Sequence, residues 1–364
     1  MNTIGERLQA TFFGESHGEV IGIVIRGLPA GMPIDIGRIK LRLEQRRPAA
    51  LWESARQEPD DFEIASGYRG NLSTGAPLTV LIKNRDVASA DYENLKNTPR
   101  PSHADYPAHV KYAGHNDPRG GGVFSGRITA LTVVLGAICE AFLERSNIEV
   151  FSHILSVKDI HDDAFDKSNV NNELAKRLKS SRFPVINPEK AELMTTLIKE
   201  TKATLDSVGG VVESAILNLP VGLGEPLFGS LESRLSQLLF SIPGVKGIEF
   251  GDGFGLTELY GSEANDAYHY DGDRVVATTN HNGGILGGLS TGMPVILRMA
   301  IKPTPSIGKP QRTVDLEKRV DTTITVGGRH DPAIIARVVP VVNAVISFGI
   351  CDLLYQFHES DWIK

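Results

Sequence analysis

The sequence has few cysteines, no excess of basic residues and no long uninterrupted apolar run. Its 364 residues include only Cys139 and Cys351, each within an apolar stretch, which is typical of reduced, buried thiols in the cytoplasm. Lys and Arg number 38 against 44 Asp and Glu, a formal net charge of −6, so the basic excess of a nucleic-acid-binding protein is missing. Because the chain also lacks a run of about 18 apolar residues and an apolar segment near its N-terminus, we expect a cytoplasmic protein without a membrane span.

The residues that are present are those of an ordinary folded protein with a surplus of glycine. Apolar residues make up 41% and charged residues 23% of the chain, which is enough for a sizeable core. The length is compatible with two domains or one large unit, but no linker-like segment divides it, and we expect a single domain over residues 1–364. The 37 glycines, about 10% against an average of about 7%, direct attention to the turns in which they fall.

The spacing of apolar residues predicts a mixture of strands and helices. Alternation at a period of two predicts strands, and apolar residues three and four apart predict helices. Asn187, Pro188 and Glu189 form a typical helix start. The expected strands are residues 8–13, 19–29, 62–70, 77–84, 211–220 and 295–302, the expected helices are 35–43, 127–143, 187–209 and 337–357, and residues 84–122 are expected to be rich in loops.

One short pattern occurs twice. Residues 73–77 (STGAP) precede the strand LTVLIK, and residues 290–294 (STGMP) precede the strand VILRMAIK. Each strand is followed by an apolar helix that holds a cysteine before an acidic residue, Cys139 in one case and Cys351 in the other. A match this short can arise by chance, but it favours an internally pseudo-symmetric unit.

Residues 14–18 (GESHG) match the pattern of a hydrolase nucleophile elbow, with Ser16 as the nucleophile. That motif needs a strand before the turn and a helix after it, whereas the segment EVIGIVI after this turn alternates like a strand. A serine hydrolase is therefore kept as the alternative function. The same turn would present Ser16 and His17 as an exposed polar tip, suited to hydrogen-bonding an anion and delivering a proton, or merely solvated.

Other loops and helix ends carry cations beside glycine or proline. Arg46 and Arg47 end the first expected helix, where they suit capture of a phosphate or carboxylate and equally suit the helix dipole. His103, within RPSHADY, is a candidate acid or base in a proline-stiffened loop. The other histidines near it fit no zinc pattern, and no metal site is expected.

Two glycine-rich segments do not match the common nucleotide-binding motifs. Residues 119–127 (RGGGVFSGR) lead into a helix, which suits an anion, but Arg127 stands where a P-loop has lysine. Residues 282–288 (NGGILGG) precede a turn and a strand, which disfavours a Rossmann fold. With KPTPS and GRHDP, these loops suit a small substrate that carries several negative charges. The side chains concerned are His17, Arg46, Arg47, His103, Arg119, Arg127, Lys302, Arg329 and Asp331.

In this order and over nearly the whole chain, the segments resemble the chorismate synthase family. The motifs that carry the resemblance are GESHG, GLPAG, EQRRP, STGAPLTVLIKN, DYENLK, RPSHADY, RGGG, SVGGVVE, IPGVKGIEFGDGF, NHNGGILGGLSTGMP, KPTPS and GRHDP. The resemblance implies an α+β fold, a non-Rossmann β-α-β sandwich that assembles as a homotetramer. It also implies a shikimate-pathway lyase that converts 5-enolpyruvylshikimate 3-phosphate to chorismate and phosphate by 1,4-anti elimination, with reduced FMN that is not consumed.

The resemblance further implies roles for individual residues. His17 would protonate or hydrogen-bond the departing phosphate, His103 would balance charge on the reduced flavin, and Asp331 would serve a proton relay at flavin N5. The implied contacts of substrate or NADP phosphate are Ser16, Arg46, Arg47 and Arg127. The implied flavin contacts are Ser125, Pro243, Gly244, Gly287, Lys302, Pro303, Thr304, Pro305, Ser306 and Arg329.

The chain departs from the common family pattern at several positions. Val123 and Phe124 stand where many members have Arg-Ser, Ile128 where many have Glu, and Trp52 where a further arginine is common. The change at Trp52 weakens the case for a nicotinamide site, and the short insertions favour a separate flavin reductant, with NADPH acting only indirectly. A flavin-binding relative without activity is a third interpretation beside the lyase and the hydrolase.

Overall fold

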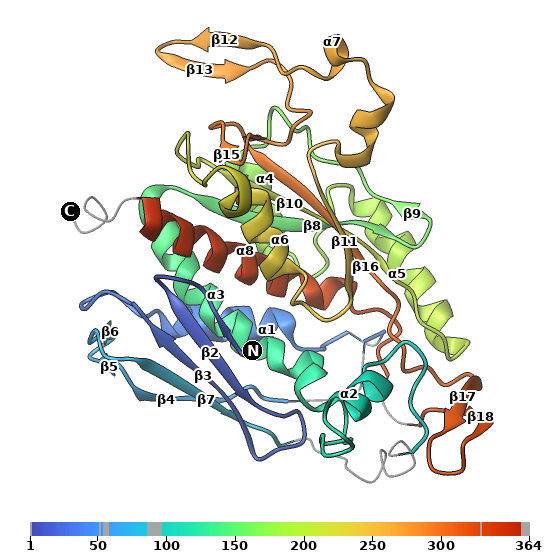
Figure 1. Cartoon of the computed structure of the whole chain (residues 1–364). Helices are drawn as coiled ribbons and strands as arrows, with labels where there is room; N and C mark the ends of the chain where they lie inside the picture. The colour runs from blue at the N-terminus through green and yellow to red at the C-terminus, as the bar shows by residue number, and fades with distance from the viewer. Residues whose placement is uncertain (1, 51, 54–57, 86–96, 328–329, 358–364) are drawn as a thin grey trace.

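The computed structural model describes residues 2–50, 52–53, 58–85, 97–327 and 330–357. Its main elements form three layers, with helices packed between two five-stranded sheets (Figure 1). The expected α+β class and the β-α-β sandwich are therefore confirmed. Two features of the sequence, the motif DYENLK and Arg329, lie outside the described residues.

The N-terminal sheet is antiparallel and has β3 at its centre. In spatial order its strands are β1 (Thr3–Ile4), β2 (Gln9–Gly14), β3 (Val20–Arg26), β7 (Leu78–Lys83) and β4 (Phe62–Ser66). Alternate side chains of a strand share a face, and Ile21, Ile23 and Ile25 of β3 are each at most 1% exposed. The GESHG turn joins β2 to β3, so the strand expected after that turn is confirmed.

The second sheet is also antiparallel and is covered on both faces. In spatial order its strands are β11 (Val245–Phe250), β16 (Val295–Ile301), β10 (Gly210–Leu217), β8 (Glu149–Val157) and β9 (Ile160–His161). On β8, Val150 packs into the main core, whereas its neighbour Phe151 packs against Leu178 of α4 (Asn172–Ser180) on the other face. This two-sided burial explains why the strand is apolar throughout rather than alternating.

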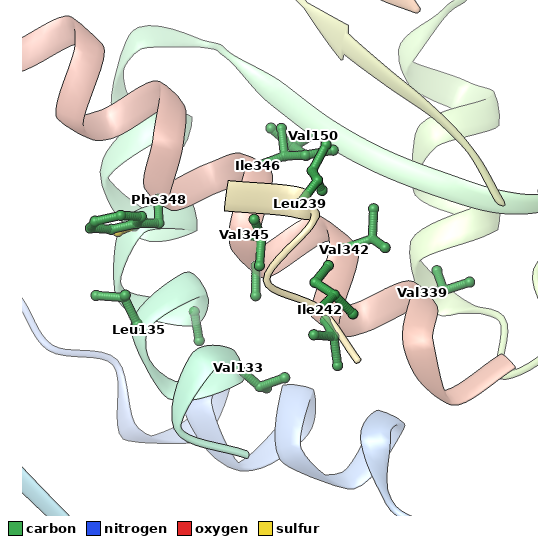
Figure 2. Close-up of a cluster of buried hydrophobic side chains, with 14 of the residues drawn as sticks. Val133, Leu135, Val150, Leu239, Ile242, Val339, Val342, Val345, Ile346 and Phe348 are labelled. Atoms are coloured by element: carbon green, nitrogen blue, oxygen red, sulfur yellow. The ribbon is translucent and has the colours of Figure 1, made fainter. Parts of the chain in front are cut away.

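The helix layer is built on α3 (Thr129–Leu143) and α8 (Ile335–Phe357), which pack against each other and against α1 (Ile36–Arg46) and α6 (Leu231–Leu239). At the crossing, a Cβ added to Gly136 would lie 2.1 Å from the Cβ of Ala344, so only glycine permits this approach. Figure 2 shows side chains from α3, α6, α8 and β8 meeting in the resulting core.

Both long helices are apolar enough to resemble membrane spans. Gly126–Ser146 and Ile335–Phe357 qualify by length and composition. However, 67% and 83% of their respective most apolar windows are buried within the protein. Helices that are apolar on all sides are expected at the centre of a large core, and that position accounts for their composition.

The two sheets belong to two copies of one arrangement. The first repeat runs β2, β3, α1, β4, β7 and α3, and the second runs β8, β10, α6, β11, β16 and α8. The spatial strand orders β2-β3-β7-β4 and β8-β10-β16-β11 correspond one to one. The pseudo-symmetry expected from the STG pattern is therefore confirmed, and it extends over most of the chain.

The repeated serines make the same hydrogen bonds in both repeats. The hydroxyls of Ser73 and Ser290 each accept a backbone N–H, from Met32 at 3.0 Å and from Leu223 at 2.9 Å. Each hydroxyl also donates to the carbonyl oxygen of the proline three residues before that partner. The serine of the STG pattern thus has the same role in both repeats: it connects the start of the following strand to an earlier loop.

The two cysteines meet at the contact between the repeats. Both thiols are free and buried, and the Sγ of Cys351 lies 3.5 Å from the carbonyl oxygen of Cys139. Burial raises the pKa of the Cys351 thiol well above its usual value, so the thiol stays protonated and unreactive. The expectation of buried, unbridged cysteines is confirmed.

The remaining elements lie around the two repeats, and the clearest departures from the expected boundaries are in α2, α3 and α5. α2 (Asp105–Lys111) is a short helix within the stretch expected to be loop, and α3 begins at Thr129 after two 3-10 turns rather than at Arg127. α5 (Pro188–Ala203) has the expected Asn187 cap but ends well before Gly209, because Leu205 adopts a positive φ of 58°. The other strands are β5 (Tyr68–Arg69), β6 (Leu72–Ser73), β12 (Tyr268–Asp271), β13 (Arg274–Ala277), β14 (Ile285–Leu286), β15 (Leu289–Ser290), β17 (Gln311–Asp315) and β18 (Val320–Ile324), and the other helices are α7 (Gly261–Ala264), η2 (Gly122–Phe124), η3 (Gly126–Ile128), η4 (Glu144–Ser146), η5 (Leu227–Gly229) and η6 (Gly253–Glu258).

Candidate active site

A cavity of about 700 Å³ opens where corresponding ends of the two repeats meet. The end of α1 and the loop after α6 line it, as do the starts of α3 and α8 and the loop that follows β16. This volume lies within the range of about 300–1,000 Å³ that is usual for small-molecule sites. Since helix N-termini carry partial positive charge, the starts of α3 and α8 favour an anionic ligand here.

Most of the residues singled out from the sequence line this cavity. The ones that do are Arg46, His103, Ser125, Pro243, Gly244, Lys302, Pro303, Thr304, Pro305, Ser306 and Asp331. The ones that do not are Ser16, His17, Arg47, Arg119, Arg127 and Gly287, while Arg329 falls outside the described residues. Segments more than 200 residues apart are therefore brought to a single site.

His103 belongs to a compact cluster with Arg100 and Asp105. Its Nδ1 lies 2.5 Å from Oδ1 of Asp105, and the Nη2 of Arg100 donates to the same oxygen at 2.7 Å. Burial alone would raise the pKa of Asp105, but hydrogen bonds from Arg100 and His103 hold it well below its usual range. Arg100 also donates from Nη1 to the hydroxyl of Ser306 at 3.3 Å, which links this cluster to the loop after β16.

Asp331 is held by an arginine that the sequence analysis missed. Arg337, in the first turn of α8, donates from Nη1 to Oδ2 of Asp331 at 2.5 Å and from Nε to the carbonyl of Arg46 at 3.1 Å. Its side chain also lines the cavity. The sequence did contain a signal for Arg337, because it is a lone cation in the first turn of an otherwise apolar helix, and charged side chains are rarely buried in a core without a partner.

Arg46 lies between the cavity and a buried carboxylate. Its Nη2 donates to Asp60 at 2.9 Å, and Arg127 donates to the other oxygen of the same carboxylate. The Nε of Arg46 is buried and has no hydrogen-bond partner among the described residues, whereas the residue as a whole is 4% exposed and lines the cavity. Arg127 points away from the cavity, with Nε donating to Asn84 at 2.9 Å. The structure thus gives Arg46 a place at the ligand and Arg127 a supporting place behind it.

Ser16 and His17 are not the exposed tip that the turn suggested. Ser16 is fully buried, His17 is 6% exposed, and the hydroxyl of Ser16 lies 3.1 Å from Nδ1 of His17. Gly120, which lines the cavity, covers them, because a Cβ added there would fall 2.2 Å from Cε1 of His17. The strand that leaves the turn and the burial of Ser16 both argue against a hydrolase elbow.

Two lysines add positive charge on the side of the second repeat. Lys246 and Lys302 both line the cavity, and Lys302 donates from Nζ to the carbonyl of Ser102 at 2.6 Å. Burial and, secondarily, the nearby Lys246 lower the pKa of Lys302. Ser102 itself has a φ of 59°, an uncommon conformation for a non-glycine residue that often marks a functional loop.

Two of the expected ligand contacts lie elsewhere in the subunit. Arg47 caps α1 and donates from Nη1 to the carbonyl of Pro59 at 2.8 Å, which agrees with the structural interpretation of this residue. Gly287 lies in the turn between β14 and β15, where the carbonyl of Gly288 accepts from the N–H of Leu231 at the start of α6, whereas the cavity is lined by residues 240–246 after the other end of that helix. Neither residue can touch a ligand in this cavity within one subunit as described.

The two residues that depart from the family pattern form part of the cavity wall. Val123 and Phe124 are 42% and 41% exposed, and together with His103 they separate the main cavity from a second one of about 370 Å³. The wall is therefore apolar at this point, and the cationic groups of the site lie on its other sides.

Comparisons with known proteins all lead to one family. Residues 8–355 match the family model described as chorismate synthase. The chain is 43% identical over 353 residues to chorismate synthase of Thermococcus kodakarensis, covering 97% of each chain, and 42% identical over 353 residues to that of Dehalococcoides mccartyi, covering 97% of this chain and 96% of the other. A solved structure titled "Crystal Structure of Chorismate Synthase" matches with a TM-score of 0.77 and 27% identity over 99% of this chain and 95% of the other.

Proposed function

We propose that this chain eliminates phosphate from 5-enolpyruvylshikimate 3-phosphate within the cavity between its two repeats. The proposal follows from its family, because the chain belongs to the chorismate synthase family of carbon–oxygen lyases. The product is chorismate, formed by 1,4-anti elimination with reduced FMN bound and with no net redox change. The observation that carries this assignment is the convergence of arginines, lysines and proton-transfer groups from both repeats on one cavity of suitable size.

The residues at the cavity fit a bound flavin. Arg46, Lys246 and Lys302 line the cavity beside an apolar wall that includes Val123 and Phe124, a combination that suits the phosphate and the ring system of a flavin. Ser125, the turn at Pro243 and Gly244, and the run from Lys302 to Ser306 would hold the cofactor. Bound reduced FMN would lend electron density to the substrate as phosphate leaves and recover it afterwards, a step that no side chain of the protein supplies.

The protein's own cations bind and orient the substrate, which carries two carboxylates and a phosphate. Arg46, Arg100 and Arg337 line the cavity, and planar guanidinium groups suit bidentate contacts with these anions. Lys246 and Lys302 add point charges. Because the chain as a whole has a net charge of −6, this local excess of cations is what attracts and holds the substrate.

Three side chains take the proton-transfer roles. His103 balances charge beside the flavin, and Asp331, held by Arg337, serves the proton relay at flavin N5. His17 would protonate or hydrogen-bond the departing phosphate; it does not line the cavity and lies behind Gly120, so this role requires the phosphate to reach it past the RGGG loop. General acid–base catalysis of this kind contributes about 10²–10⁴-fold to a rate.

We further propose that the active form is a cytoplasmic homotetramer supplied by a separate flavin reductant, with NADPH acting only through that reductant. Large apolar side chains exposed far from the cavity support the assembly, since exposed apolar patches mark interaction surfaces. They include Leu227 at 82%, Phe228 at 93% and Tyr270 at 78% exposure. Equilibrium ultracentrifugation of the purified chain tests the tetramer.

The central experiment is an anaerobic assay. Chemically reduced FMN and 5-enolpyruvylshikimate 3-phosphate are added to the protein, and release of phosphate and growth of the diene absorbance are followed. We expect both signals together and neither with oxidised FMN. Absence of product with the reduced cofactor would refute the lyase assignment, and stoichiometric labelling of Ser16 by a fluorophosphonate would favour the hydrolase.

A further inference from the structure

Asp105 is fully committed to its neighbours. The carboxylate accepts hydrogen bonds from the backbone N–H of Arg100 at 2.9 Å, from Nε of Arg100 at 2.7 Å and from Nη2 of Arg100 at 2.7 Å. It also lies 2.5 Å from Nδ1 of His103. Three donors from one arginine keep the carboxylate ionised, so in this cluster Asp105 can only accept hydrogen bonds.

Because the Asp105 carboxylate beside Nδ1 can only accept hydrogen bonds, it determines which nitrogen of His103 carries the proton. An ionised carboxylate 2.5 Å from Nδ1 requires Nδ1 to be the N–H donor, and the neutral ring then has its lone pair on Nε2. Nη2 of Arg100 lies 3.1 Å from Nδ1 of His103, but a protonated Nδ1 has no lone pair with which to accept a hydrogen bond. Nη2 of Arg100 therefore donates to Oδ1 of Asp105 instead.

The opposite edge of the ring is left for the ligand. No residue of the described chain makes a hydrogen bond to Nε2 of His103, and that edge lies beside Gly121, where an added Cβ would be 3.5 Å from Cε1 and from Nε2. His103 lines both the main and the second cavity. The side chain is 17% exposed, so Nε2 is the part of the ring available for proton exchange.

The local fold makes this arrangement rigid. Asp105 is the first residue of α2, where its negative charge complements the helix dipole. The backbone N–H of His103 bonds to the carbonyl of Arg100 at 3.2 Å, which closes a turn between them. Arg100 is 4% exposed, so the cation that keeps Asp105 ionised has little freedom to move.

We propose that Asp105 is a positioning residue for the elimination, which holds His103 as the Nδ1–H tautomer and so presents Nε2 as the atom that accepts and returns a proton at the flavin and substrate. The inference rests on the proposed function for its catalytic consequence, but the tautomer itself does not. Arg100 acts with Asp105, since without that cation the carboxylate would compete for the proton.

The first test reads the tautomer directly. In ¹⁵N spectra of the folded full-length protein, with the ring signals of His103 assigned by their loss in His103→Gln, we expect a protonated Nδ1 and an unprotonated Nε2 at a pH above the titration of the ring. In Asp105→Asn the amide can donate as well as accept, so the Nε2–H form should appear. A wild-type ring protonated on Nε2 would overturn the inference, whether or not the protein shows turnover.

The second test reads the consequence for catalysis. Asp105→Asn should lower kcat about 10²-fold, with a much smaller change in KM, and should shift the acidic limb of the pH–rate profile. Glu144→Gln, which removes a comparable two-point carboxylate partner of Arg38 at 2.6 and 2.7 Å far from the cavity, should leave both unchanged. An Asp105→Asn protein with a wild-type pH profile would overturn the positioning role, and the wild-type spectrum decides the question if this variant does not fold.

Discussion

The two repeats share a backbone plan but place their charges at different points of it. In the first repeat, α1 ends at the cavity with Arg46. The corresponding helix of the second repeat, α6, is followed at the cavity by the uncharged segment 240–244. The long helices differ in the opposite sense: the cavity-lining residues before α3 include the uncharged Val123, Phe124 and Ser125, while Asp331 before α8 and Arg337 in its first turn are charged.

This difference teaches which features the duplicated fold requires and which it leaves open. Ser73 and Ser290 make the same hydrogen bonds, and the two strand orders correspond, because these features hold the sheet to its loop. The loop ends that face the cavity do not take part in holding the sheet to its loop. Their side chains can therefore differ between the repeats. As a result, the two repeats place different charges around the cavity that they form together.

The largest effect is expected at the contact between the repeats. Gly136→Val would place atoms within about 2 Å of Ala344 and should cost more than about 4 kcal/mol, enough to prevent folding. At Gly349 on α8 an added Cβ meets only side-chain ends, 2.9 Å from Leu238 and 3.1 Å from Leu235, so Gly349→Ala should be much milder. Urea unfolding of both variants measures the difference, and equal losses would contradict the special role of the crossing.

The next effect concerns the buried charges of the first repeat, which have no counterpart at the end of α6. Asp60→Asn keeps a residue that tolerates the positive φ of 54° but removes the charge that pairs with Arg46 and Arg127, which leaves Arg127 only Glu58 at 3.8 Å, at a cost of about 3 kcal/mol. Urea titrations near pH 7 should show this loss. A stability equal to that of the wild type would mean that the carboxylate contributes nothing.

The same variant should also change the dependence of stability on pH. Burial opposes ionisation of Asp60, but Arg46 and Arg127 hold its pKa below the ordinary value. The resulting stabilisation is present above the unfolded-state pKa of about 3.9 and is lost as the pH falls from there through the folded-state pKa. The wild type should therefore lose stability in this range more steeply than Asp60→Asn.

A smaller effect is expected for the charges that only the second repeat contributes. Arg337→Gln removes the donor to Asp331 and to the carbonyl of Arg46, and should lower kcat/KM about 10- to 100-fold, or about 1.4–2.7 kcal/mol. Arg38→Gln, in a surface pair with Glu144, is the matched control and should retain full activity. If the two variants were equally active, Arg337 would have no part in the site.

The smallest effects should be equal in the two repeats. Ser73→Ala and Ser290→Ala each remove one acceptor and one donor from equivalent loops, and each should cost about 1–2 kcal/mol. Denaturant midpoints of the two variants should agree closely. A large difference would show that the repeats are similar in topology but not in energetics.

Much of the local structure could be predicted from short segments of sequence. The GESHG turn between two strands, the start of α5 at Asn187 and the apolar helix after each STG strand depend on contacts between near neighbours, and all are found. Ser125, Pro243, Gly244 and Asp331 were named from motifs and do line one cavity. Arg337 was missed because its motif is an apolar helix, and its role depends on Asp331 six residues earlier.

By itself, the sequence determined the elements, the family and the chemical character of the site, because propensities, turn residues and ordered motifs act over a few residues at a time. Only the tertiary structure decided which cations meet the ligand. Arg46 and Arg127 look alike in sequence and share Asp60, yet Arg46 lines the cavity whereas Arg127 donates to Asn84 away from it. Such a choice depends on how buried charges from distant segments are paired, and the folded arrangement of the two repeats sets that pairing.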